Sequence, residues 1–278
     1  MRAAAVTNKS LDFTTSQLQV IKHRGAPLLV TGAAGTGKTT TLISAISDRI
    51  DQGCDPNTIL AITYGRESAS KLRDQIATAN PQRHIVNEPI ARTFHSIAFL
   101  ILNESEKKYV LLSGAEQDAE IRQLLLIDAQ KEKEQPGSTD WPPELVAALT
   151  TRGFAKELRD FIGRATERGS SPTELIKFAD KYGQKYWPAI CKFWSRYQGA
   201  VALRNLTTTH SLNRIDPSEI IIAASEKLEK NPQLREKYQK LFPIIYVDEF
   251  QESDRGQRKL LELLAGAELH IFADPNQR

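Results

Sequence analysis

The feature that most constrains the fold of this chain is a glycine-rich octapeptide, GAAGTGKT, at residues 32–39. It fits the pattern G-x-x-x-x-G-K-T, whose glycines let backbone N–H groups curl around phosphate oxygens without a Cβ atom in the way. The loop follows the apolar run APLLVTG and precedes TTTLISAISDRI, which has helical spacing. A bound phosphate would therefore also meet the positive end of a helix. The sequence predicts a strand, a loop and a helix that bind a nucleoside triphosphate.

Each residue of this loop has an expected place around the nucleotide. We expect Lys38 to reach the β- and γ-phosphates and the Thr39 hydroxyl to hold Mg²⁺. The nucleotide-binding residues predicted here are Gly32, Ala33, Ala34, Gly35, Thr36, Gly37, Lys38, Thr39 and Thr40.

A second motif, IYVDEFQESD at residues 245–254, places two adjacent acids at the end of an apolar run. Such a pair is costly at the end of a buried strand unless a cation lies opposite. The loop above identifies that cation as the Mg²⁺ ion on the nucleotide. We expect Asp248 to position the metal through water and Glu249 to take a proton from the attacking water. The alternative is a helix N-terminus decorated with acids.

The chain alternates strands with helices near both ends but not in the middle. From about residue 104 to 212 only helical segments are found, among them one that starts with Ser171, Pro172 and Glu174 in capping-box order. This predicts an α/β fold with a parallel sheet and helices on both faces, interrupted by an all-helical insertion. The expected domains are 1–104, 105–212 and 213–278. The strands expected after the first are TILAITY (58–64), PIART (89–93), PIIYVDEF (243–250) and ELHIFAD (268–274).

Composition narrows the class of protein further. The 278 residues are 40% hydrophobic and 26% charged, with a net charge of +3, which is ordinary for a globular protein. No apolar run approaches the roughly 20 residues of a membrane span. Two cysteines are too few for a disulfide framework or a four-thiolate metal site. We expect a cytoplasmic protein with no membrane contact.

The long insertion between the two nucleotide motifs, together with DEFQ, resembles the first motor domain of the UvrD/Rep family of superfamily 1 DNA helicases. The resemblance covers most of the α/β part, while the helical insertion matches by position and class. It implies a RecA-like P-loop fold, with ATP and Mg²⁺ as cofactors. FTTSQ (13–17) resembles the Q motif, in which Gln17 would read the adenine edge. The alternative is that Thr14 and Gln17 merely form a capping box.

The resemblance also assigns roles to two glutamines and to the residues that would contact DNA. Gln251 and Gln277 would sense the γ-phosphate, so the implied catalytic set is Lys38, Asp248, Glu249, Gln251 and Gln277. AITYGRESASKLRDQI (61–76) and RTFHS (92–96) resemble the DNA-contact motifs. The residues that they imply for DNA binding are Thr63, Tyr64, Arg66, Thr93, Phe94 and His95. The sequence departs from the family at Thr40, at Gly65 and Arg66, and at Ala273, and the change at 65–66 puts that DNA contact in doubt.

The implied function is the ATP-binding part of a 3′-to-5′ DNA helicase that acts in repair or recombination. The implied substrates are single-stranded DNA and its junctions with duplex. The resemblance also implies a nucleoid-associated cytoplasmic location and partner proteins from repair or recombination. In the family a second motor domain follows this point, and we expect these 278 residues to lack it. The chain alone is therefore expected to bind Mg-ATP with little hydrolysis and no unwinding. One alternative is the motor part of a helicase–nuclease. Another is a nucleotide-gated DNA-binding module that does not hydrolyse ATP.

The helical insertion contains KYWPAICKFWSRY (185–197), in which aromatic and basic residues are mixed. In the family the corresponding subdomain contacts duplex DNA, which such a mixture would suit. The alternative is an amphipathic helix with aromatic core residues and solvated basic residues.

Overall fold

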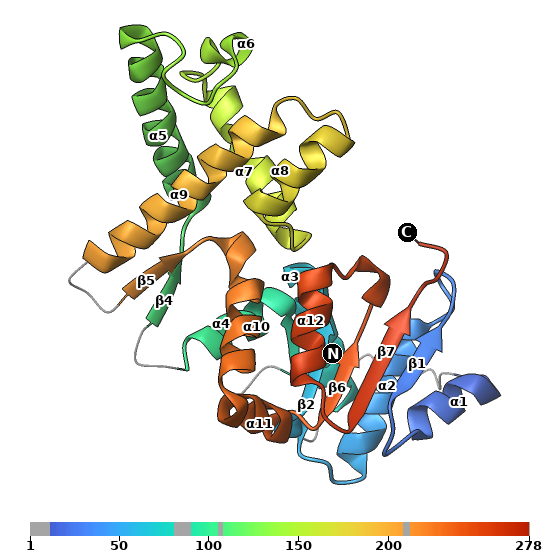
Figure 1. Ribbon diagram of the computed structural model, residues 1–278. Helices are drawn as coiled ribbons and strands as arrows, with labels where there is room; N and C mark the ends of the chain where they lie inside the picture. The colour runs from blue at the N-terminus through green and yellow to red at the C-terminus, as the bar shows by residue number, and fades with distance from the viewer. Residues whose placement is uncertain (1–11, 81–89, 105–107, 208–211, 278) are drawn as a thin grey trace, which may run out of the picture. The chain divides into compact units, whose positions relative to one another are not determined.

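The computed structural model describes residues 12–80, 90–104, 108–207 and 212–277 (Figure 1). The chain forms two compact units. The first comprises Met1–Thr93, Glu236–Ser253 and Leu264–Arg278, and the second comprises Phe94–Arg235 and Asp254–Leu263. These limits are set by the compactness of the two units and do not test where an insertion begins and ends. The insertion boundaries expected at 104/105 and 212/213 therefore remain a prediction.

The first unit is built on a five-stranded parallel sheet, which confirms the α/β class. The strand order is β1-β7-β6-β2-β3. The strands are β1 (Leu28–Thr31), β2 (Ile59–Thr63), β3 (Ala91–Thr93), β6 (Ile244–Val247) and β7 (Glu268–Ala273). Each expected strand is therefore present, although part of 89–93 lies outside the described residues. Because all five strands run the same way, their carboxyl ends share one edge of the sheet, which we call the carboxyl edge.

Three helices cover one face of this sheet: α1 (Thr15–Lys22), α2 (Lys38–Asp51) and α3 (Arg66–Ala79). Their apolar side chains pack with alternate residues of the strands, such as Tyr246 and Phe272. The intervening strand residues Ile62 and Val247 are also fully buried. Central strands that are buried on both faces account for the continuous apolar runs in the sequence.

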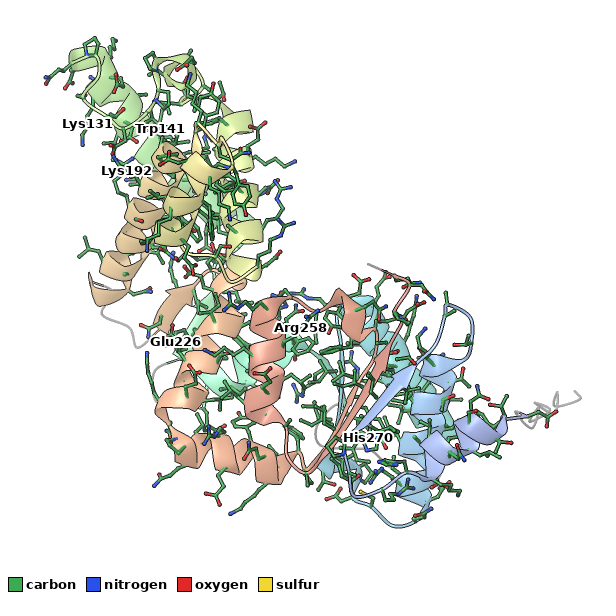
Figure 2. The ribbon with its side chains drawn as sticks, turned by 45° about the vertical axis from the view of Figure 1, so that its right-hand side comes forward. Lys131, Trp141, Lys192, Glu226, Arg258 and His270 are labelled. Atoms are coloured by element: carbon green, nitrogen blue, oxygen red, sulfur yellow. The ribbon has the colours of Figure 1, made fainter. Side chains whose placement is uncertain are left out.

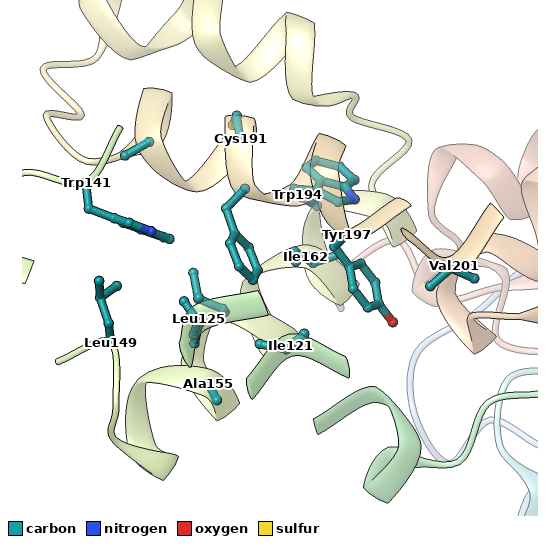
Figure 3. Close-up of a cluster of buried hydrophobic side chains, with 14 of the residues drawn as sticks. Ile121, Leu125, Trp141, Leu149, Ala155, Ile162, Cys191, Trp194, Tyr197 and Val201 are labelled. Atoms are coloured by element: carbon teal, nitrogen blue, oxygen red, sulfur yellow. The ribbon is translucent and has the colours of Figure 1, made fainter. Parts of the chain in front are cut away.

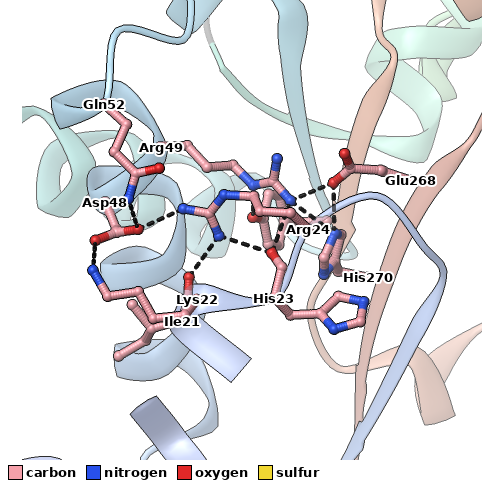
Figure 4. A network of polar contacts seen from close by, with 10 residues as sticks. Ile21, Lys22, His23, Arg24, Asp48, Arg49, Gln52, Glu268 and His270 are labelled. Carbon is pink, nitrogen blue, oxygen red and sulfur yellow. Dashed lines mark hydrogen bonds and ion pairs between the residues drawn. The ribbon is translucent and has the colours of Figure 1, made fainter. Parts of the chain in front are cut away.

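The opposite, amino edge of the sheet holds a network of charged side chains (Figure 4). Helix α2 returns to this edge and brings Arg49, which is 4% exposed, against β6 and β7. Arg49 donates to the Tyr246 hydroxyl at 2.7 Å and pairs with Glu268. His270, which Figure 2 labels on β7, stacks on Tyr246 with ring centroids 4.6 Å apart. The buried guanidinium thus finds its partners within the unit.

The second unit is mainly helical. Its helices are α4 (Phe94–Leu102), α5 (Gly114–Glu134), α6 (Pro143–Val146), α7 (Arg152–Glu167), α8 (Pro172–Lys181), α9 (Trp187–Thr207), α10 (Ile220–Lys230) and α12 (Arg255–Leu264). Helix α11 (Pro232–Leu241) crosses the limit between the units, and short 3-10 helices occupy Pro56–Thr58, Pro217–Glu219 and Phe250–Glu252. The capping box at Ser171 and Glu174 is confirmed. Within the described residues, no helix has both the length and the apolar character to cross a membrane.

The core of the second unit is rich in aromatic residues (Figure 3). Phe193, Trp194 and Tyr197 are each at most 2% exposed, so the aromatic residues of this part of KYWPAICKFWSRY form core. The Asp128 carboxylate is fully buried among them. Asp128 accepts hydrogen bonds from Trp141 Nε1 at 2.7 Å and from Arg196 Nη1 at 2.8 Å. These two hydrogen bonds, one of them from a guanidinium group, explain how a fully buried acid is tolerated in an apolar core.

The expectation that no strand lies between 104 and 212 was wrong. Strand β4 (Lys108–Leu111) pairs in parallel with β5 (Leu212–Ile215), which begins where the insertion was expected to end. Most of the β4 side chains are exposed, so KYVL shows neither an apolar run nor a clear alternation. The strand is held mainly by a partner distant in sequence, which a local pattern does not reveal.

Candidate active site

The phosphate-binding loop joins β1 to α2 at the carboxyl edge of the sheet. Gly35 and Gly37 have φ angles of +78° and +83°, which residues with a Cβ atom rarely adopt. A Cβ atom at Gly32 would lie 2.7 Å from the Thr36 hydroxyl. Ala33, Ala34 and the other exposed loop residues are open to solvent, and Thr40 is half-buried on α2. The local fold expected from GAAGTGKT is confirmed.

Lys38 is the first residue of α2 and is 9% exposed. Its ammonium group donates to the backbone carbonyl groups of Gly32 and Ala33 at 2.9 and 3.0 Å. The Asp274 carboxylate, at the end of β7, lies 3.8 Å away. The lysine is thus held over the loop by partners that it can exchange for a stronger anion. A phosphate group is such an anion, since it presents several charged oxygens to a point charge.

The closest contact between the two sequence motifs is a hydrogen bond that joins α2 to β6. Thr39 Oγ1 donates to Asp248 Oδ2 at 2.8 Å, across 209 positions in the sequence. Asp248 is 6% exposed. Burial raises the pKa of its carboxyl group, the Thr39 hydrogen bond opposes this, and the charge of Glu249 raises it further. An ionised carboxylate at this position lacks a full counter-charge.

These two side chains fit a magnesium ion. A hydroxyl group and a carboxylate already in contact supply the oxygen ligands that Mg²⁺ prefers. A cation there would also relieve the desolvation that raises the pKa of Asp248. Within the described residues, no group of three or more His, Cys, Asp or Glu side chains could hold a metal without help. A Mg²⁺ ion bound by one or two protein oxygens usually takes its remaining ligands from water and substrate phosphates.

Glu249 has an unusual backbone. Its φ of 53° is the only positive value for a residue other than glycine in the described part of the chain. This left-handed conformation is costly for a side chain with a Cβ atom and is found mainly at functional sites. It turns the chain sharply between β6 and the 3-10 helix at Phe250–Glu252. In this turn the backbone N–H of Glu249 donates to Asp248 Oδ1 at 3.1 Å, so the two acidic residues are held together at the carboxyl edge.

Gln251 connects three parts of the site. Its Nε2 donates to Glu249 Oε2 at 2.5 Å and to Gln277 Oε1 at 3.3 Å. Its Oε1 accepts the backbone N–H of Asp274 at 2.8 Å. The amide thus links the acid after β6 to the segment after β7. The sequence did not indicate the contact with Asp274, because it depends on β6 and β7 being neighbours in the sheet.

Gln17 lies against the phosphate-binding loop. The capping box with Thr14 is present, and Gln17 Nε2 also donates to the Thr36 carbonyl at 3.2 Å. The same amide is 3.0 Å from the position of a Cβ atom on Gly37. The structure therefore brings Gln17 to the nucleotide loop while it caps α1. Its role in reading adenine stays a prediction.

The residues predicted to bind DNA differ in exposure. Thr63 and Thr93 are paired in register at the carboxyl ends of β2 and β3, but their exposures are only 3% and 9%. Tyr64 is half-buried and Arg66 is exposed at the start of α3. In the second unit, Phe94 is 1% exposed and His95 is half-buried on α4. The Phe94 ring is core in this structure, so the accessible candidates are Arg66, Tyr64 and His95.

One site residue was missed by the sequence analysis. The sequence motifs assigned no role to Asp274. In the structure it is 1% exposed, faces Lys38 and accepts the backbone N–H of Asn276 at 2.9 Å. Its place directly after the apolar run of β7, at the same edge as Asp248, is the signal that could have identified it.

Comparison with known proteins agrees with this geometry. The family model described as "UvrD/REP helicase N-terminal domain" matches residues 13–278. The chain is 25% identical over 269 residues to a protein of Bacillus subtilis named as a putative ATP-dependent DNA helicase, YjcD. It is 25% identical over 273 residues to the ATP-dependent DNA helicase PcrA of Staphylococcus aureus, and 27% identical over 266 residues to DNA helicase II of Haemophilus influenzae.

These alignments cover most of this chain but only part of each relative. They span 94%, 95% and 91% of the chain, and 31%, 33% and 32% of YjcD, PcrA and DNA helicase II respectively. The chain thus spans about a third of the length of the curated relatives that it matches.

Proposed function

Because this chain belongs to the UvrD/REP helicase N-terminal domain family, we propose that it is the ATP-binding part of an ATP-dependent DNA helicase. The observation that carries the proposal is the hydrogen bond from Thr39 to Asp248. It joins the phosphate-binding loop to the acidic motif at one edge of a parallel sheet. That edge is where open α/β sheets bind their ligands.

In this proposal each side chain acts on the nucleotide from a position that it already holds. Lys38 exchanges its contacts with the Gly32 and Ala33 carbonyl groups for phosphate oxygens. Thr39 and Asp248 hold Mg²⁺, which would neutralise developing phosphate charge when bound. Gln17 reads the adenine edge from its place beside the loop. Glu249 takes a proton from the attacking water.

Gln251 and Gln277 would report the γ-phosphate. Gln251 donates to the Glu249 carboxylate, so the proposed base is hydrogen-bonded to this amide. A γ-phosphate oxygen is a competing acceptor for the same N–H group, and its arrival would release Glu249. Gln251 also accepts the backbone N–H of Asp274. Loss of the phosphate would therefore change the backbone contact at the end of β7.

Single-stranded DNA is the proposed substrate track, with Tyr64 and Arg66 as its accessible contacts in the first unit. Both lie directly after β2, whose neighbour β6 carries the acidic motif. An aromatic face and a cation are the groups that hold a single strand without reading its sequence. The 3′-to-5′ polarity, the action on junctions, the repair or recombination pathway with its partner proteins, and a nucleoid-associated cytoplasmic location remain predictions.

The test is Mg-ATP binding and steady-state hydrolysis, with and without single-stranded DNA, for the wild type and Lys38→Ala. The matched control is Lys240→Ala, which removes an exposed lysine on α11. We expect Mg-ATP binding that Lys38→Ala weakens at least about tenfold, since a charge-assisted contact with phosphate is lost, and that Lys240→Ala leaves unchanged. Equal binding by the wild type and Lys38→Ala would overturn the proposal.

The hydrolysis arm distinguishes the alternatives. Low turnover by this chain, increased when the remaining two thirds of a full-length relative are supplied, supports a motor completed by arginine residues from a second domain. Binding without turnover under both conditions favours the nucleotide-gated module. A helicase–nuclease would differ only in residues beyond this chain.

A further inference from the structure

The exposed aromatic side chains of this chain are gathered in one place. Among the described residues, three aromatic side chains are more than a third exposed: Phe178 at 43%, Tyr182 at 57% and Tyr186 at 38%. All three lie in the nine residues that end α8 and turn into α9 in the second unit (Figure 1). We call this surface, with the lysines described below, the aromatic corner. Most other aromatic residues of this unit are packed in its core, so these three are not needed to fill it.

Basic residues alternate with these rings at the same spacing. Lys177, Lys181 and Lys185 each precede one of the aromatic residues, so both sets repeat every four positions. Lys181 Nζ lies 5.3 Å from the centroid of the Tyr182 ring, and Lys185 Nζ lies 5.5 Å from that of Tyr186. Lys185 pairs with Glu144, whereas Lys177 and Lys181 form no ion pair with a carboxylate of the described residues.

The rings at the corner are exposed to solvent and touch one another. Phe178 and Tyr182 meet edge to face, with centroids 5.9 Å apart and planes inclined at 60°. Gly183, with a φ of +62°, ends the helix and turns the chain, so residues 180–186 are all exposed. Exposed aromatic rings next to lysine ammonium groups match a ligand that combines planar apolar groups with regularly spaced negative charges.

We propose that the aromatic corner binds single-stranded nucleic acid by stacking unpaired bases on Phe178 and Tyr182, while Lys177 and Lys181 contact the phosphates. Duplex cannot offer the same contact, because its bases are stacked on each other inside the helix. A lipid surface fits less well. Of the other apolar side chains of α8, Leu175 and Ala179 are buried and Ile176 is 37% exposed, which leaves this ten-residue helix without a broad apolar face for a membrane. Base–aromatic stacking accepts any sequence, and the lysines make binding sensitive to salt.

The proposal gives the second unit a strand contact of its own, separate from the predicted track after β2. It therefore does not depend on the nucleotide site. Lys38→Ala is expected to leave this contact intact, so the failure of one proposal can be recognised without the other.

The first experiment measures the affinity of the full chain for a fluorescent oligothymidylate by anisotropy. The variant is Phe178→Ala combined with Tyr182→Ala. We expect it to bind about tenfold more weakly, because two stacking faces are removed. Two controls are matched to it: Tyr182→Phe keeps the ring, and Leu203→Ala removes an exposed apolar side chain, 62% exposed, on α9. Both are expected to bind as the wild type does, and thermal melts establish that each variant is folded.

The second experiment separates stacking from charge by using a strand of the same length with abasic sugars. The double aromatic variant should bind this strand as the wild type does, because only phosphates remain. Lys177→Gln with Lys181→Gln should weaken binding to both strands and reduce the salt dependence. Strands with 5-iododeoxyuridine should crosslink to the peptide that contains residues 178–186.

Three results would overturn the proposal. The first is that the wild type shows no affinity for oligothymidylate. The second is unchanged oligothymidylate binding by the double variant, which would assign the corner to a protein partner. The third is that the double variant loses affinity for anionic phosphatidylserine vesicles and keeps its affinity for oligothymidylate. That result would assign the corner to a membrane.

Discussion

Both edges of the parallel sheet bury charged side chains, but the two edges differ in the partners that these side chains have. At the amino edge Arg49 is satisfied by Glu268 and the Tyr246 hydroxyl, all within the chain. At the carboxyl edge Asp248 accepts from the Thr39 hydroxyl and pairs with no cationic side chain among the described residues, and burial raises the pKa of its carboxyl group. Charge that is fully paired holds the fold together. Charge left without a full counter-charge indicates where an ion or substrate binds.

The largest effect that tests this comparison is expected from Arg49→Ala. The change leaves Glu268 and the Tyr246 hydroxyl without their buried partner, and breaking a buried pair costs about 3–5 kcal/mol of unfolding free energy. Urea unfolding monitored by circular dichroism measures it. The Lys240→Ala control should stay within about 0.5 kcal/mol of the wild type, because surface substitutions rarely matter. A loss below about 1 kcal/mol for Arg49→Ala would mean that this network is not structural.

His270 should make the amino edge sensitive to acid. Burial, the largest cause, lowers the pKa of its imidazole from 6.5 to about 4. The unfolded chain therefore takes up a proton below pH 6.5 that the folded chain refuses, so stability is complete above that pH and falls as the pH drops towards 4. At about 1.4 kcal/mol per pH unit, the loss reaches about 2 kcal/mol near pH 5.

The measurement is the free energy of unfolding in urea from neutral pH down to about pH 5, for the wild type and His270→Gln. The variant should lose most of the slope in this window. Glu268 does not obscure the result. Burial raises the pKa of Glu268, but its contacts with Arg49 outweigh this and hold the value below the ordinary 4.5, so its contribution is lost only at lower pH. Equal slopes for the two proteins would contradict the assignment.

The pH dependence of stability that Asp248 contributes should have the opposite sign to that of His270, and Asp248→Asn should remove it. Because the folded pKa is raised, the ionised carboxylate costs stability above that pKa, and the cost disappears as the pH falls below the unfolded value. The amide keeps an acceptor for Thr39 and removes the charge. We expect the nucleotide-free variant to gain about 1 kcal/mol at neutral pH. Stabilisation by Mg-ATP should be lost, as thermal shift with and without the ligand would reveal. A less stable apo variant would indicate that the Asp248 charge is structural.

The sequence predicted the first unit well for a physical reason. Strands buried on both faces leave continuous apolar runs, and the phosphate-binding loop fixes its own backbone through Gly35 and Gly37. The pairing of β4 with β5 was missed because its side chains are largely exposed. The aromatic residues of the insertion could not be divided between core and surface until the helices were packed. Phe193 is core and Tyr186 is not, although both are aromatic residues of one short segment.

Within the site, the sequence predicted residue types better than their partners. The pairing of Thr39 with Asp248 follows from two motifs that each end or begin an element at the same edge. The bond from the Asp274 backbone to Gln251 does not, because 23 positions separate the residues and only the strand order brings them together. The left-handed backbone of Glu249 also had no signal, since glutamate rarely adopts it.

The smallest effect is expected next to Arg49, at the exposed end of the same network. Lys22 pairs with Asp48, but its side chain is 63% exposed, and Asp48 keeps Arg24 and the Gln52 amide as partners. Lys22→Ala should therefore lower the unfolding free energy by less than about 0.5 kcal/mol, and by less still at high salt. Urea unfolding of Lys22→Ala beside Arg49→Ala makes the comparison within one cluster. Similar losses would show that pairing alone sets the stability of these charges, whereas the expected gap would show that burial decides it.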